Sequence, residues 1–143
     1  MAARLIVLCL PEGTPPADPE PDATAKREVE LAYRWSGSPA GVVGWAEGGW
    51  AAVELAATYP DLVDRLVLVS TPVPEADDVL ELDAVRAKAL LLHGARDGGH
   101  AEATWWQKRL SARIEMVPGA GRDILERVWP RVLSHLAPRS LRK

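Results

Sequence analysis

The sequence predicts a single α/β domain over residues 1–143, built on a mostly parallel sheet of about five strands with crossover helices. Four short runs are apolar throughout, at residues 5–10, 41–45, 66–69 and 89–92. Unbroken apolar runs of this length are typical of strands buried on both faces, as in parallel sheets. A fifth run, at residues 113–117, alternates apolar and polar side chains, which favours a strand at the edge of the sheet.

Helix-like stretches separate these runs. The predicted connecting helices are residues 22–33, 49–59, 77–87 and 101–112. Strands that alternate with helices of this length describe a parallel sheet, because each parallel neighbour needs a crossover connection.

Two proline-containing segments complete the chain. Residues 11–21 contain five prolines and are predicted to form an exposed, irregular loop. The tail at residues 124–136 is predicted as a turn followed by a helix that begins near Trp129 and Pro130. Proline is tolerated there because the amides of the first helical turn need no partner.

The composition is globular, with 48% hydrophobic and 26% charged residues and a net charge of −3. The 17 basic residues are scattered among 20 acidic ones and form no basic run, which argues against a nucleic-acid partner. Cys9 is the single cysteine, which fits a reducing compartment. The apolar run at residues 5–10 is too short for a membrane span or a signal peptide. We therefore expect a cytoplasmic protein with no membrane, cofactor or metal.

The segment from Gly44 to Gly49 reads Gly-Trp-Ala-Glu-Gly-Gly and joins an apolar run to an alanine-rich helix. This is the context of the G-x-S-x-G nucleophile elbow, with Ala46 in the place of the serine. In such an elbow the central residue lies on a strained strand-to-helix turn, and small flanking residues let the backbones pass. Because Gly44 and Gly48 flank it at this spacing, we expect Ala46 to have a positive φ.

From about residue 41 to about residue 136, the chain resembles the α/β-hydrolase family. Residues 51–72 are similar to the helix and strand that follow the elbow in that family. Residues 4–15 resemble, more loosely, the strand and loop before its first large helix. The resemblance implies a truncated α/β-hydrolase core without a cap, in which the N-terminal strands of the family are missing.

The triad positions of that family follow in its order of nucleophile, acid and histidine. Ala46 stands at the nucleophile position. Residues 89–97 resemble the strand and turn that deliver the acid, which places Asp97 at the surviving acid position. Residues 117–122 resemble the loop that carries the histidine, and Arg122 stands in its place.

Two of these three residues are incompatible with the mechanism of the family. Ala46 has no hydroxyl group, so no acyl-enzyme can form on it. Arg122 stays protonated at any working pH and cannot act as a general base. The resemblance also implies that one oxyanion donor is absent. We therefore expect an α/β-hydrolase-like protein that is inactive by Ser-His-Asp chemistry and acts as a binding or interaction module, or is a degenerate paralogue.

A second interpretation stays open, in which the chain is an esterase-like hydrolase that uses Glu47, Asp97 and His100. Glu47 follows the elbow and could act as a base, although an acid is also simply favourable at a helix N-terminus. Asp97 is equally explained as a turn residue, and we expect it to form an ion pair with Arg122. The candidate ligand-binding residues are Trp45, Glu47 and His100.

Other conspicuous side chains have structural explanations. His93 closes an apolar run and is predicted to be a structural histidine. His135 is predicted to lie on the surface of the terminal helix. Trp105 and Trp106 are adjacent large rings at a helical position, which favours a place in the core or at an interface.

The predicted topology has a consequence for partners. If residues 5–10 pair beside residues 42–43, right-handed crossovers put every connecting helix on one face of the sheet. Only the terminal helix is left for the other face. Apolar side chains of these two segments, together with an open edge strand, are then expected to be exposed. The sequence therefore predicts a homo-oligomer or a partner chain that covers them.

Overall fold

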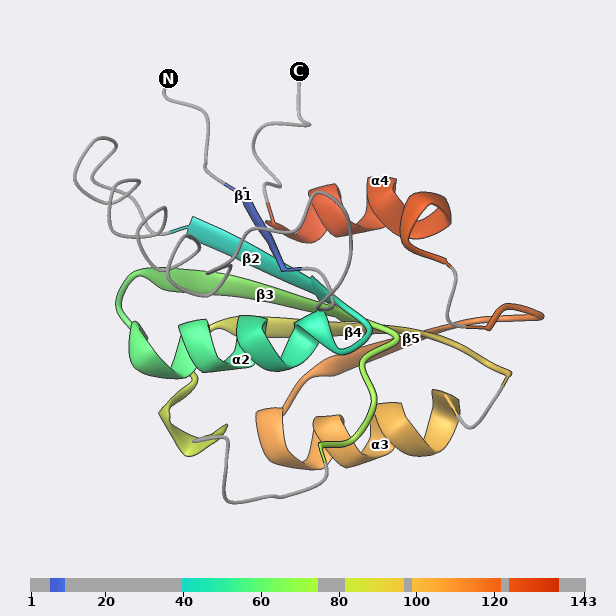
Figure 1. Ribbon diagram of the computed structural model, residues 1–143, viewed down its shortest axis with the longest axis horizontal. Coiled ribbons are helices and arrows are strands. Elements are labelled where there is room, and N and C mark those ends of the chain that lie inside the picture. The colour runs from blue at the N-terminus through green and yellow to red at the C-terminus, as the bar shows by residue number, and fades with distance from the viewer. Residues whose placement is uncertain (1–5, 10–39, 75–81, 97–98, 122–123, 137–143) are drawn as a thin grey trace.

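The structure is a computed structural model that describes residues 6–9, 40–74, 82–96, 99–121 and 124–136. Its centre is a five-stranded sheet with helices on both faces (Figure 1). The predicted helix at residues 22–33, the proline-rich loop at residues 11–21, Asp97 and Arg122 lie outside the described residues.

All neighbouring strands of the sheet are parallel, and their order in space is their order in the chain. The strands are β1 (Ile6–Cys9), β2 (Ala40–Trp45), β3 (Val63–Val69), β4 (Lys88–Gly94) and β5 (Arg113–Val117). β1 pairs with β2, with Val7 opposite Val42, as the topology argument predicts. β5 lies at one edge of the sheet, in agreement with its alternating sequence. The α/β fold class predicted from the sequence is therefore confirmed.

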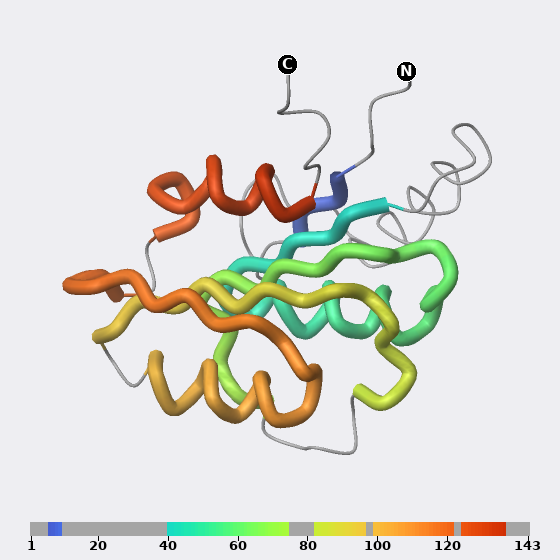
Figure 2. The backbone as a smooth tube through the Cα atoms, turned by 180° about the vertical axis from the view of Figure 1, so that it is seen from behind, coloured from blue at the N-terminus to red at the C-terminus, as the bar shows by residue number. Residues whose placement is uncertain are grey.

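Helices cover the two faces unequally. α2 (Gly48–Thr58) and α3 (Gly99–Leu110) lie on one face, and α4 (Leu125–Leu136) lies on the other (Figures 1 and 2). This is the arrangement that crossovers of one hand and one direction produce. The alanine-rich α2 ends at Tyr59, whose amide donates to the Leu55 carbonyl, directly before Pro60.

Each face of the sheet therefore has its own hydrophobic core. Alternate residues of a strand point to opposite faces. On β2, Val42 belongs to the core under α2 and α3, whereas Val43 belongs to the core under α4. Trp106 is the largest buried side chain of the first core, and Leu136 closes the second. Because the central strands are buried on both faces, their sequences are apolar at successive positions rather than at alternate ones.

Two helix predictions need correction. Within the described part of the predicted helix at residues 77–87, only a 3₁₀ turn, η2 (Leu82–Ala84), is helical. Leu82 and Val85 still pack on the core beside α2 and α3, and the chain enters β4 only three residues after Val85.

The terminal helix begins at Leu125 rather than near Trp129, so Pro130 lies inside it. A proline in that place removes the hydrogen bond to the carbonyl four residues earlier, which belongs to Glu126. Both Glu126 and Pro130 are exposed, so water can solvate that carbonyl. The predicted start is wrong because Pro130, a residue typical of first helical turns, lies here in the interior of the helix.

Burial on the α4 side also differs from expectation. Val43 is 0% exposed, because α4 packs on β2 and β3, so the predicted exposure of this residue is wrong. Leu8 on β1 is 41% exposed. Uncovered apolar surface on this face is thus confined, within the described parts of the chain, to the β1 edge. None of the described helices is long and apolar enough to cross a membrane.

Candidate functional site

The carboxyl ends of parallel strands meet at one edge of the sheet, which is where ligands bind in open α/β folds. At this edge β2 runs into Ala46, β3 into Ser70 and β4 into Ala95. In register, Trp45 lies opposite Val69, and Val69 lies opposite Leu92. Ala46 and Ser70 are therefore neighbours, each one residue beyond the end of its strand.

Ala46 has the strained conformation that the elbow motif predicts. Its φ is 52°, in the left-handed region that a residue with a Cβ rarely adopts. Its amide donates to the Val69 carbonyl over 2.8 Å, and its own carbonyl accepts from Gly49 over 3.0 Å, which starts α2. The side chain is 6% exposed. The turn therefore directs a methyl group to the position where the resemblance implies a nucleophile.

Close backbone packing explains the glycines around the turn. A Cβ on Gly44 would come within 2.4 Å of the Gly49 Cα, and a Cβ on Gly49 would come within 2.0 Å of the Thr71 Oγ1. Neither position can accept a side chain without movement of its neighbour. The tight approach thus joins Gly44 to Gly49, one residue beyond the second glycine of the predicted motif.

The loop after β3 is fastened to its neighbours through the Thr71 carbonyl. This oxygen accepts from Trp106 Nε1 over 2.9 Å and from His93 Nε2 over 3.2 Å. Because a carbonyl only accepts, Nε2 of His93 carries the hydrogen. Trp50 Nε1 donates to the Pro72 carbonyl over 2.9 Å and adds a third tie. His93 is fully buried, in agreement with the structural role predicted for it.

Ser70 is a residue of this edge that the sequence analysis missed. Its φ is 49°, and its side chain is 2% exposed. The Oγ atom makes no hydrogen bond in the described structure, and neither does the Thr71 Oγ1 atom. The one signal in the sequence was its place directly after an apolar run, the same place that Ala46 has after β2.

The remaining candidates lie around this edge without forming a cluster in the described structure. Glu47 is exposed and is the N-cap residue of α2, although its side chain makes no capping hydrogen bond. His100 is exposed in the first turn of α3. Trp45 is half-buried and packs on the core under α4. In the described parts of the chain, no group of three or more potential metal ligands occurs.

The two outer loops of the edge are joined by backbone hydrogen bonds. Ala95 donates to the Val117 carbonyl and Arg96 to the Ala120 carbonyl, each over 3.0 Å. The segments that precede positions 97 and 122 are thus brought together. Asp97 and Arg122 themselves lie outside the described residues, so their ion pair stays a prediction.

The tryptophan pair on α3 faces its own chain. Trp106 is fully buried, and its ring meets that of Trp105 edge to face, with 4.9 Å between centroids. The guanidinium of Arg109 lies over the Trp105 ring at 3.9 Å from its centroid. This places Trp106 in the core and occupies one face of Trp105, as expected for structural rings.

Known proteins with similar sequences and structures are hydrolases by name. A pimeloyl-[acyl-carrier protein] methyl ester esterase from Chromobacterium violaceum is 32% identical over 130 residues, which make up 90% of this chain and 49% of that protein. The chain thus spans about half the length of the curated relative it matches. No protein-family model matches the chain.

Solved structures give the fold. The dienelactone hydrolase from Anabaena variabilis has a TM-score of 0.71 at 16% identity and covers 94% of this chain, which in turn covers 85% of it. A CIB-like hydrolase from Thermoplasma acidophilum has a TM-score of 0.62 at 23% identity, over 84% of this chain and 60% of its own. Together with the parallel sheet and the strained turn at Ala46, these likenesses assign the chain to the α/β-hydrolase fold.

Proposed function

We propose that this chain is a hydrolase-like protein that binds a ligand or a partner at the carboxyl edge of its sheet and does not use Ser-His-Asp chemistry. The observation that carries the proposal is Ala46, whose methyl group occupies a strained elbow at φ 52°. Acyl transfer in this geometry needs a nucleophilic oxygen at that position, and alanine has none.

The residues at the other positions of the predicted triad, and the neighbouring serine, also argue against Ser-His-Asp chemistry. Arg122 stands in the sequence position where the resemblance implies a histidine, and a guanidinium does not accept a proton. The neighbouring Ser70 hydroxyl does not replace the missing nucleophile, because it is 2% exposed and makes no hydrogen bond to a base in the described structure. The chain thus has the strained turn of a nucleophile elbow but no nucleophilic hydroxyl group on it.

The test is reaction with activated esters. Wild-type protein, at about 10 µM, is incubated with p-nitrophenyl butyrate and, separately, with a fluorophosphonate probe. We expect neither turnover above the rate in buffer nor labelling. Turnover that survives repurification and is lost on denaturation would overturn the proposal.

Substitutions at Ala46 and Arg122 distinguish the effect of the missing hydroxyl from that of the missing base. Ala46→Ser alone is expected to give no turnover, because the sequence position where the resemblance implies the histidine base holds Arg122, which cannot accept a proton. The double variant Ala46→Ser/Arg122→His restores both the nucleophilic hydroxyl and the histidine base. Labelling by the fluorophosphonate probe is most favoured in this variant. Ala57→Ser, in the last turn of α2, is the matched control for an added hydroxyl. Turnover by Ala46→Ser well above its parent would contradict the argument.

A second candidate function is ester hydrolysis by unorthodox groups, which the similarity to the Chromobacterium methyl ester esterase favours. Glu47 and His100 are exposed at the ends of α2 and α3, where solvent and substrate can reach them. Any wild-type turnover would be assigned with Glu47→Gln and His100→Gln. Glu54→Gln, at an exposed position of α2, is the control. Loss of turnover in Glu47→Gln and His100→Gln, with turnover retained in Glu54→Gln, would establish ester hydrolysis by these groups.

A further inference from the structure

The amino ends of β3, β4 and β5 bring together basic residues that are far apart in the sequence. Arg65 on β3 lies directly opposite Lys88 on β4. Arg65 alternates with Val67, and Lys88 with Leu90, and both of these apolar residues belong to the core under α4. The two basic side chains therefore point to the face that α4 covers.

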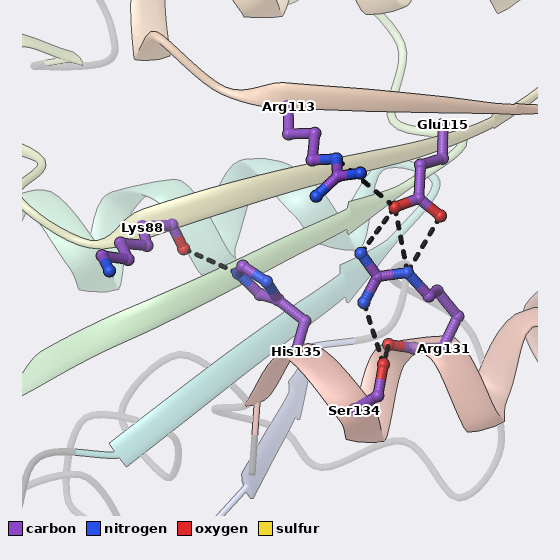
Figure 3. Close-up of polar contacts among 6 residues, drawn as sticks. All are labelled: Lys88, Arg113, Glu115, Arg131, Ser134 and His135. Carbon is purple, nitrogen blue, oxygen red and sulfur yellow. Dashed lines mark hydrogen bonds and ion pairs between the residues drawn. The ribbon is translucent and has the colours of Figure 1, made fainter. Parts of the chain in front are cut away.

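β5 and α4 add two guanidinium groups to the same face. The single Nε–H of Arg131 is shared between the two carboxylate oxygens of Glu115 on β5, each 2.9 Å from Nε, and Arg131 Nη2 donates to Oε2 (Figure 3). Arg113 Nε lies 3.8 Å from the same carboxylate. Figure 3 shows Arg131 of α4 and Arg113 of β5 on the Glu115 carboxylate, and the Lys88 carbonyl beside His135, with the Lys88 side chain extending away from the two arginines. We call Arg65, Lys88, Arg113 and Arg131 the basic patch.

The charge balance of this patch is strongly positive. Among the described residues, Glu115 is the carboxylate that pairs with the patch, and Arg131 and Arg113 share it. In the part of the chain that the structure describes, Arg65 and Lys88 form no ion pair. His135, which lies among them with Nε2 2.9 Å from the Lys88 carbonyl, senses this field: after burial, the charges of Arg65 and Arg131 help to lower its pKa.

The patch is open to solvent. Lys88 is exposed, and the Arg113 side chain is 77% exposed. The protein as a whole carries a net charge of −3, so a cluster of this sign is not a general property of its surface. It also lies at the amino ends of the strands, away from the edge that holds Ala46.

We propose that the basic patch is a docking surface for an acidic segment of a partner protein. Charge complementarity carries the inference, because clustered cations of this kind attract and orient an acidic partner. Three neighbouring strands span only about 10 Å, which suits two or three carboxylates better than a long polyanion. The net negative charge of the protein also opposes a nucleic acid, whose charge extends well beyond the patch. The contact between Arg131 and Glu115 illustrates the geometry, because Nε and Nη2 of this guanidinium donate to the two oxygens of a planar carboxylate.

The test uses fluorescence anisotropy with a fluorescein-labelled twelve-residue peptide in which three consecutive glutamates are flanked by glycine and serine. In 50 mM NaCl we expect saturable binding to the wild-type protein, weakened at least fivefold at 300 mM NaCl because salt screens exposed charges. Lys88→Glu is expected to weaken binding at least fivefold. Lys108→Glu makes the same change in net charge at an exposed position of α3, on the other face, and is expected to stay within twofold.

A second set of measurements keeps the proposal open to refutation. Lys88→Gln, which only removes the charge, is expected to lie between wild type and Lys88→Glu, and thermal unfolding followed by circular dichroism verifies that each variant is folded. A labelled twelve-nucleotide single strand is expected to bind more weakly than the peptide. Equal effects of Lys88→Glu and Lys108→Glu, absence of saturable binding, or tighter binding of the oligonucleotide would each overturn the proposal.

Discussion

At the scale of single residues, the chain keeps backbone strain at the carboxyl edge of its sheet. Three described residues other than glycine have a positive φ, namely Ala46, Ser70 and Ser111. Two of them, Ala46 and Ser70, lie side by side in register beyond β2 and β3. Such strain persists only where the surrounding packing enforces it. Here the close approach of Gly44 to Gly49 and the hydrogen bond from Ala46 to Val69 supply that constraint.

Relief of this strain is measurable. We expect Ala46→Gly to raise the free energy of unfolding by about 0.5–1 kcal/mol, because glycine adopts a positive φ without a Cβ clash. Ala57→Gly, in the last turn of α2, is the matched control and is expected to lower it by up to about 1 kcal/mol. Urea denaturation of the three proteins gives the two differences. If Ala46→Gly proves as destabilising as its control, the elbow is not strained.

The candidate site could be predicted from the sequence only where a residue carries a local signal. Ala46 was found because glycines at fixed spacing imply a tight turn, and its positive φ is confirmed. Ser70 has no such flanking glycines, and its conformation depends on the hydrogen bond from its amide to Leu92 on β4. The basic patch was missed for a related reason. Arg65 and Lys88 are 23 positions apart, and only the strand register makes them neighbours.

At the scale of elements, α4 is the sole described helix on its face and depends on few polar ties. Arg131 joins it to Glu115 of β5, and His135 joins it to the carbonyl of Lys88 on β4 (Figure 3). The hydrogen bond from Arg131 lowers the pKa of Glu115, and the same bond raises that of Arg131. Both groups are about one-third exposed, so the pair stabilises the fold by about 1 kcal/mol at most.

His135 makes the attachment of α4 dependent on pH. Burial, together with Arg65 and Arg131, lowers its pKa below the ordinary value of 6.5, although its bond to the Lys88 carbonyl opposes the shift. As pH falls, the unfolded chain therefore takes up the proton before the folded chain does. The free energy of unfolding should be highest above about pH 6.5 and should decrease from there down to the lowered pKa.

Two histidine variants test this dependence. In His135→Gln, which retains a donor for the Lys88 carbonyl, we expect the decrease between pH 7.5 and 5 to become smaller than in wild type. His100→Gln, at an exposed position of α3, is expected to keep the wild-type decrease. Urea midpoints at half-unit pH steps measure both. The Glu115 carboxylate titrates below its ordinary 4.5 and leaves this window undisturbed. Identical slopes for wild type and His135→Gln would refute the assignment.

Element boundaries were less predictable than element types. The strands follow from unbroken apolar runs, since both faces of the sheet are covered, and each was placed within a few residues. The start of α4 was misplaced because Pro130 is a usual mark of a first turn, whereas here solvent exposure makes an interior proline tolerable. The helix predicted from residue 77 is wrong in its described part, where only the 3₁₀ turn Leu82–Ala84 is helical before the chain enters β4 at Lys88.

At the scale of the whole molecule, the cover of the sheet is asymmetric. α2 and α3 share one face, whereas α4 alone packs on β2 and β3 from the other (Figure 2). β1 has only four residues, pairs with β2 alone within the described chain, and exposes Leu8 on the side of α4. Unpaired strand edges beside exposed apolar side chains favour association. We therefore expect a second copy or a partner chain to contact this protein at the β1 edge.

Self-association through this edge can be tested by one pair of substitutions. Size-exclusion chromatography with light scattering is expected to give wild-type protein a mass above the 15.5 kDa of the monomer, increasing between about 5 and 200 µM. Leu8→Glu places a charge on the exposed face of β1, where burial against another copy would cost several kcal/mol, so it should return the mass to that of the monomer. Val73→Glu is the matched control, because Val73 is a similarly exposed apolar residue, 36% accessible, in the loop after β3. It should associate as wild type does. Equal loss of association in both variants would place the contact elsewhere, and a wild-type monomer at every concentration would exclude a second copy as the cover of β1.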